Sequence, residues 1–85
     1  MDLRLTAEQL AAVRAAKHLP DVLLNVLDRA APADEGFRLQ LTYEEATALN
    51  ELCAWNVHTD AQGNLTPESK LFDDLVRAIL THPDY

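Results

Sequence analysis

Metal-binding side chains are concentrated in residues 58–69, where an imidazole, carboxylates, amides and hydroxyls fall within twelve positions. Carboxylate and amide oxygens bind hard cations such as Ca²⁺, whereas imidazoles favour zinc and other transition metals. His58 and Asp60 would supply one ligand of each kind. The chemistry to test first is therefore divalent-metal binding, as a calcium loop or as part of a transition-metal site.

The calcium interpretation depends on where the ligands stand. In outline the segment resembles an EF-hand loop, because Gly63 stands at its sixth position and Leu65 at its eighth. That loop also needs oxygen ligands at positions one, three and five and a glutamate at position twelve. Asp60 alone of these four carries a carboxylate; the other three are His58, Gln62 and Ser69. We therefore expect a polar connection, its turns shaped by Asp60 and Asn64, with Gly63 at positive φ.

A zinc site would need three or four nitrogen or sulfur ligands held together. His58 and Asp60 would have to be joined by His18 or His82, and no Cys-x-x-Cys or His-x-x-x-His pair fixes two ligands on one element. We predict no metal and no cofactor. A small-ligand or divalent-metal sensor built on the 58–69 loop is kept as an alternative function.

Groups able to act in catalysis are few. Cys53, the single cysteine, lies among apolar positions late in its helix, where such a residue is usually a small buried hydrophobe rather than a reactive thiolate. Gly36 and Gly63 are the only glycines, too few for a glycine-rich phosphate loop, and no serine–histidine–aspartate motif stands out. We predict that the protein is not an enzyme.

Acidic side chains dominate the charge, with 14 Asp and Glu against 7 Lys and Arg and a formal net charge of −7. The basic residues are scattered singly along the chain, so neither a nucleic acid nor an anionic membrane surface would find a basic patch. A basic protein is the better electrostatic match.

The candidate partner-binding residues are a tryptophan and four carboxylates on two predicted helices: Trp55, Glu44, Glu51, Asp73 and Asp74. If the two helices lie side by side, the acids form a negative face that steers a basic partner, although acids so placed also suit a merely solvated surface. Trp55 falls at the edge of the apolar stripe, where it either anchors an interface or caps the core.

Four amphipathic helices are expected to position these side chains, each from apolar residues repeating at helical spacing. They cover about 7–18, 20–31, 43–57 and 67–82. Thr6 and Thr42 each begin a capping box, Thr-x-x-Gln and Thr-x-x-Glu, that opens a helix. Pro32 is expected to stop the second helix, and His82-Pro83 the last.

Two short strands are expected to precede two of the helices. Leu3 and Leu5 alternate with polar residues, as do Phe37, Leu39 and Leu41, which is the period of a strand with one buried face. The predicted fold is mainly α, of the α+β class, with four helices and a possible short two-stranded sheet. If the strands do not pair, an all-α four-helix arrangement remains.

An internal repeat is suggested by the match of Leu3–Glu8 with Leu39–Glu44. We interpret residues 1–85 as one small globular domain of two strand-helix-helix halves, 1–32 and 37–82, joined at about 33–36. The halves would pack around a pseudo-twofold axis.

The functional prediction is a small acidic protein-interaction or regulatory module, by compositional analogy with inhibitors, antitoxins and immunity proteins. Self-association as a structural homodimer is the second hypothesis. With a lone cysteine and no signal-peptide pattern at the N-terminus, the expected location is cytoplasmic.

Overall fold

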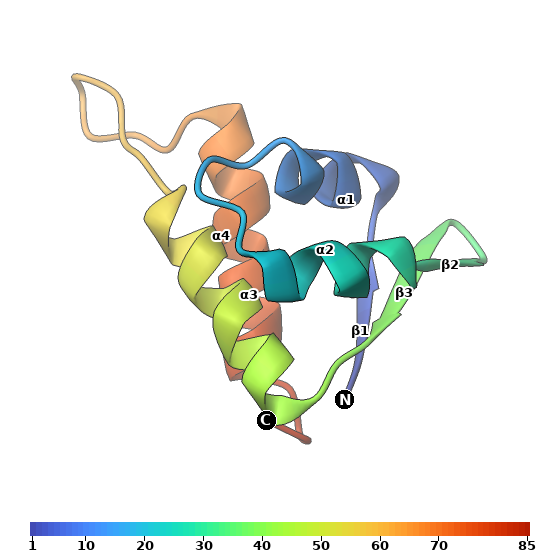
Figure 1. Cartoon of the computed structure of the whole chain (residues 1–85). Helices are drawn as coiled ribbons and strands as arrows, with labels where there is room; N and C mark the ends of the chain where they lie inside the picture. The colour runs from blue at the N-terminus through green and yellow to red at the C-terminus, as the bar shows by residue number, and fades with distance from the viewer.

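Four helices and a small antiparallel sheet make up the chain in the computed structural model, which describes residues 1–85 (Figure 1). The elements in chain order are β1 (Asp2–Leu5), α1 (Ala7–Arg14), α2 (Asp21–Asp28), β2 (Ala31–Ala33), β3 (Gly36–Gln40), α3 (Tyr43–Trp55) and α4 (Pro67–Leu80). The predicted α+β class is confirmed. No helix combines the length and the apolar character that crossing a membrane requires.

The sheet has the strand order β1-β3-β2, and all its pairs are antiparallel. The expected pairing of the two leucine-rich strands is present, with Leu3 opposite Leu39 and Leu5 opposite Phe37. The expected size of two strands was wrong, because β2 adds a third strand through a hairpin. The turn of that hairpin holds Asp34 at a φ of 40° and coincides with the junction expected at 33–36.

Each sheet edge has one backbone group that is withdrawn from pairing with another strand. Met1 and Leu41 exchange two backbone hydrogen bonds, so the alternation of an antiparallel ladder turns the backbone groups of Asp2 outward. His82 occupies one of these groups: its Nδ1 accepts from the Asp84 N–H, and its Nε2–H donates to the Asp2 carbonyl at 2.7 Å. At the other edge the same alternation turns Pro32 outward, and proline has no N–H to offer.

The helices begin where the capping signals placed them, but all four end earlier than expected, α3 and α4 by about two residues and α1 and α2 by more. Thr6 and Thr42 both form complete capping boxes, and Thr66 caps α4. Helix α1 stops at Arg14 rather than near His18, because the chain turns and His18 takes a φ of 64°. Helix α2 stops at Asp28 rather than near Ala31, because the residues after it enter β2.

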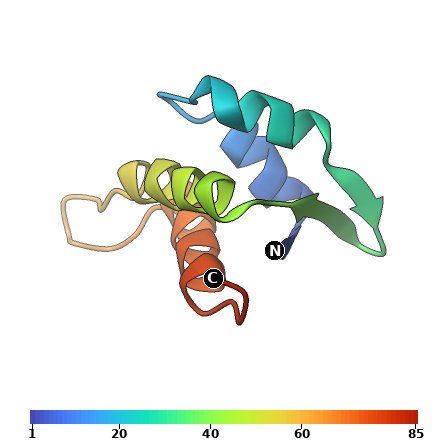
Figure 2. The ribbon, with the colours of Figure 1, turned by 60° about the horizontal axis from the view of Figure 1, so that its bottom comes forward.

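Helix α4 packs against α1, α3 and β1, and α2 packs across α3 and β3 (Figure 2). The core consists of sixteen buried apolar side chains: Leu3, Leu5, Leu10, Val13, Leu23, Val26, Leu27, Leu39, Leu41, Ala46, Leu49, Leu52, Cys53, Phe72, Leu75 and Ile79. An ion pair of 2.8 Å between Arg29 and Glu45 joins the end of α2 to the first turn of α3. This packing fixes α2, and the turn that precedes it, beside α3.

Candidate functional site: a groove beside helix α3

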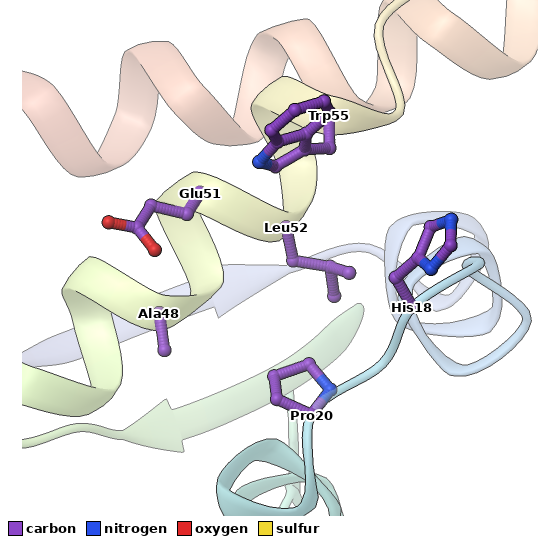
Figure 3. Close-up of a pocket in the computed structure, with 6 residues that line it drawn as sticks. All are labelled: His18, Pro20, Ala48, Glu51, Leu52 and Trp55. Atoms are coloured by element: carbon purple, nitrogen blue, oxygen red, sulfur yellow. The ribbon is translucent and has the colours of Figure 1, made fainter.

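A groove of about 440 Å³ runs between α3 and the turn that links α1 to α2. Its lining residues are His18, Pro20, Ala48, Glu51, Leu52 and Trp55 (Figure 3). Leu52 points from α3 toward the 18–20 segment, whereas Trp55 and His18 stand at the rim. The floor is therefore apolar, and the polar groups lie where an incoming molecule would first meet them.

The α3 wall follows from helical spacing. The buried positions of α3, such as Leu49 and Cys53, face the core. Its outward ridge consists of Glu44, Ala48, Glu51 and Trp55, spaced three and four residues apart. Trp55 is the last helical residue and is 77% exposed. Of the two readings left open by the sequence, a cap over the core is thus wrong, and the tryptophan is on the surface.

The opposite wall of the groove is the turn between α1 and α2, and its shape follows from the backbone angles of His18 and Pro20. His18 adopts a left-handed φ of 64°, and Pro20 is the extended N-cap of α2 with φ −75° and ψ 152°. Left-handed backbone is uncommon outside glycine, so the α1–α2 turn is tightly defined here. Proline fixes the direction in which α2 leaves the turn.

The electrostatic character of the groove comes from Glu51. Five ion pairs link basic and acidic side chains in the protein, and neither Glu44 nor Glu51 takes part in any of them. No hydrogen bond within the chain occupies either carboxylate. The α3 ridge therefore presents two uncompensated negative charges, of which Glu51 lies one turn from the exposed indole and Glu44 lies at the far end of the helix.

The two aspartates on α4 are in a different situation. Asp73 is paired with Arg77 at 3.0 Å, and Asp74 with Lys70 at 3.9 Å, both at i,i+4 spacing. Neither aspartate lines the groove. The structure thus brings Trp55 and Glu51 together, keeps Glu44 on the same ridge, and leaves Asp73 and Asp74 in locally neutralised pairs.

Four of the lining residues were not anticipated as site residues: His18, Pro20, Ala48 and Leu52. Ala48 lies four residues before Leu52, and Leu52 lies one turn before Trp55 on α3. Helical spacing alone could therefore have placed both of them near Trp55. His18 and Pro20 carry no such signal, because only the tertiary packing of α2 brings their turn to α3.

The 58–69 loop has the turn structure expected of it. The Asp60 carboxylate accepts from the N–H groups of Gln62 and Asn64, and Gly63 has a φ of 81°. Buried Ser69 ties the ends together, accepting from the His58 N–H at 2.8 Å and donating to the Asn56 carbonyl at 3.4 Å. The histidine, cysteine and acidic side chains form no cluster of three or more suited to a metal ion.

Cys53 is fully buried in the core, as expected from its helical position. Burial among apolar groups raises the pKa of its thiol to about 12, because the low-dielectric interior disfavours the thiolate. At neutral pH this side chain is a packed hydrophobe and is not available as a nucleophile.

Comparison of the chain with protein-family models, with curated proteins and with solved structures finds no match.

Proposed function

We propose that this protein is a small acidic interaction module that binds a basic segment of another protein along helix α3. The exposure of Trp55 above an apolar groove is the observation that carries the proposal. Covering an indole so exposed removes on the order of 150 Å² of mainly apolar area from water, which is about 4 kcal/mol of favourable free energy. A regulatory role of the inhibitor, antitoxin or immunity type is the class that we favour.

The charge distribution supports a basic partner. Glu44 and Glu51 add two uncompensated charges to the ridge that carries Trp55. The overall charge of −7 would accelerate encounter with a cationic surface, and the ridge would orient it. On α4, by contrast, Lys70 and Arg77 offset the charges of Asp73 and Asp74, so the docking face that we propose is narrower than a surface spanning both helices.

Two double charge reversals test this proposal with a matched control. Glu44→Lys with Glu51→Lys and Asp73→Lys with Asp74→Lys change the net charge equally but at different places. Each variant, once its thermal unfolding shows that it is folded, is immobilised and incubated with source lysate at low and moderate salt. We expect a salt-sensitive partner that the α3 variant loses and the α4 variant keeps. Equal retention by both variants would contradict docking on α3.

Self-association remains the second candidate, and the sheet edges lend it little support. Pro32 removes the outward N–H of β2, and His82 occupies the outward Asp2 carbonyl of β1. These two features disfavour pairing at a sheet edge, so helix surfaces are the more favourable place for a dimer contact. An unfolding midpoint that rises with protein concentration over a hundredfold range would favour this candidate over the interaction module.

A sensor function through the 58–69 loop is the third candidate. Asp60, its central carboxylate, is engaged by two backbone N–H groups of its own turn. A rise in melting temperature with a single divalent ion would support a sensor, and a flat response across a panel of ions would remove it. We propose neither a catalytic role nor a cofactor, and the cytoplasmic location stays a prediction, to be tested by cell fractionation.

We also propose that the fold arose from two strand-helix-helix halves. The capping boxes of Thr6 and Thr42 lie 36 residues apart, each directly after a strand of the β1–β3 pair. The cross-half contacts α1 with α4 and α2 with α3 would be equivalent under a twofold axis. The symmetry is imperfect, since α3 packs closely on α4 while α1 and α2 have no comparable contact and β2 has no counterpart.

A further inference from the structure

We propose that the groove beside α3 takes an arginine side chain of the basic partner, its guanidinium stacked on Trp55 and hydrogen-bonded to Glu51. This inference rests on the proposed docking along α3 and names the group that the groove selects. Glu51 precedes Trp55 by four residues, so the two side chains are neighbours on one helix face. The indole nitrogen is turned to the side on which Glu51 lies (Figure 3).

The combination of an exposed indole with an unpaired carboxylate decides the chemistry of the occupant. A purely apolar occupant would cover Trp55 but would also take water from the Glu51 carboxylate without replacing its hydrogen bonds, which is costly. A cation satisfies both groups at once. The attraction of a cation for the face of an indole adds to its attraction for the carboxylate, and both increase as water is excluded.

Arginine fits this pair better than lysine does. Its planar guanidinium can lie flat on an aromatic ring while its edge donates N–H bonds to a carboxylate, whereas an ammonium group acts as a compact, strongly hydrated charge. The three methylene groups of arginine would also lie along the apolar floor formed by Ala48, Leu52 and Pro20. Glu51 extends from α3 on the side opposite to His18 (Figure 3), so the negative charge that would attract the guanidinium lies at the Glu51 end of the groove.

The test uses three synthetic amphipathic peptides that differ at one central residue, which is arginine, lysine or citrulline. All three peptides keep two flanking lysines, so the electrostatic attraction that comes from residues outside the central position is the same for each. Trp55 is the only tryptophan, and its fluorescence therefore reports occupancy of this groove directly. We expect saturable emission changes, with the lysine peptide about five- to tenfold weaker than the arginine peptide and the citrulline peptide weaker still.

Three variants assign the preference to the groove. Glu51→Gln should reduce the preference for the arginine peptide to the part that stacking on Trp55 supplies, while the control Glu44→Gln, two turns away, should weaken both peptides equally and keep the full preference. Trp55→Leu, measured by calorimetry, should lose about five- to tenfold in affinity for the arginine peptide. The side chain is exposed, so this variant should melt like the unaltered protein.

The outcomes separate this inference from the proposed function. Equal, salt-dependent binding of all three peptides would refute the arginine anchor and leave docking of a basic partner in place. Absence of binding by every peptide at low salt would overturn both. An arginine preference that is undiminished in Glu51→Gln would show that the anchor is elsewhere and would also refute the inference.

Discussion

Gly36→Ala is the substitution whose effect the structure defines most sharply. A Cβ at this position would fall well inside van der Waals contact with the Leu5 carbonyl oxygen, and at 3.3 and 3.4 Å from Leu5 C and Thr6 Cα. All three atoms belong to the backbone, so no side-chain rotation can relieve the contact. Residues 5 and 6 would have to move away from β3, and Leu5 would leave its buried position.

The magnitude can be worked out from this geometry. Inserting a methyl group into a filled site typically destabilises a protein by about 1 to 3 kcal/mol. Because the atoms in contact here belong to the backbone, we expect a cost at the upper end of this range, about 3 kcal/mol. Replacing glycine reduces the freedom of the unfolded chain and returns up to about 1 kcal/mol. The expected loss is thus about 2 kcal/mol, which for a domain of this size lowers the melting temperature by roughly 10 °C.

Thermal unfolding followed by circular dichroism measures this loss, and Gly63→Ala is its control. Gly63 has a φ of 81° but open space around its Cβ position. Alanine there costs only the strain of left-handed backbone, about 1 to 2 kcal/mol, less the same return of up to about 1 kcal/mol from the unfolded chain. Amide exchange of Leu41, whose N–H bonds to Met1 in the β1–β3 pairing, should accelerate in Gly36→Ala alone. If Gly36→Ala melts within a degree or two of the unaltered protein, the close approach of β1 and β3 is wrong.

Two further predictions concern contacts within the chain. The Thr42 N–H bond, followed by the nearby Arg29 charge, lowers the pKa of Glu45 below 4.5, so its stabilising effect is present above that pH and fades as pH falls through the folded pKa. Glu45→Gln should therefore lower the melting temperature at pH 7, and the difference from the unaltered protein should shrink as the pH falls through the folded pKa of Glu45. Ser69→Ala leaves the His58 N–H without its acceptor and should cost about 1 to 3 kcal/mol in urea unfolding, whereas Ser69→Cys should cost less.

Local signals in the sequence were sufficient for the starts of α1, α3 and α4 and for the pairing of β1 with β3. The capping boxes at Thr6 and Thr42, the Thr66 cap and the paired apolar residues of 67–80 each depend on neighbours within one or two turns. The β1–β3 pairing was also accessible, because alternating leucines can bury only one face. These features needed no knowledge of the rest of the molecule.

Strand β2 and the groove itself could not be obtained in that way. Ala31–Ala33 is too short for a periodic pattern, and Pro32 in a sequence argues against a strand unless the residue is known to lie at a sheet edge. Trp55 stood at the boundary between two faces of its helix, so its exposure depended on whether a neighbouring element covered it. The position of the His18 turn, which supplies the opposite wall, depends on the packing of α2 across α3.

Several charged and polar groups on other surfaces of the protein already have partners within the chain. Asp73 and Asp74 of α4 are paired along their helix, His82 occupies the outward Asp2 carbonyl of β1, and Pro32 leaves β2 without an outward N–H at that position. On α3, neither Glu51 nor Trp55 has such a partner within the chain. Because the two side chains are neighbours, an occupant that covers Trp55 also takes water from Glu51, so its binding is favourable only if it also replaces the hydrogen bonds of that carboxylate. A partner that brings a cation and an apolar stem together meets both conditions, and a partner that brings only one of them does not.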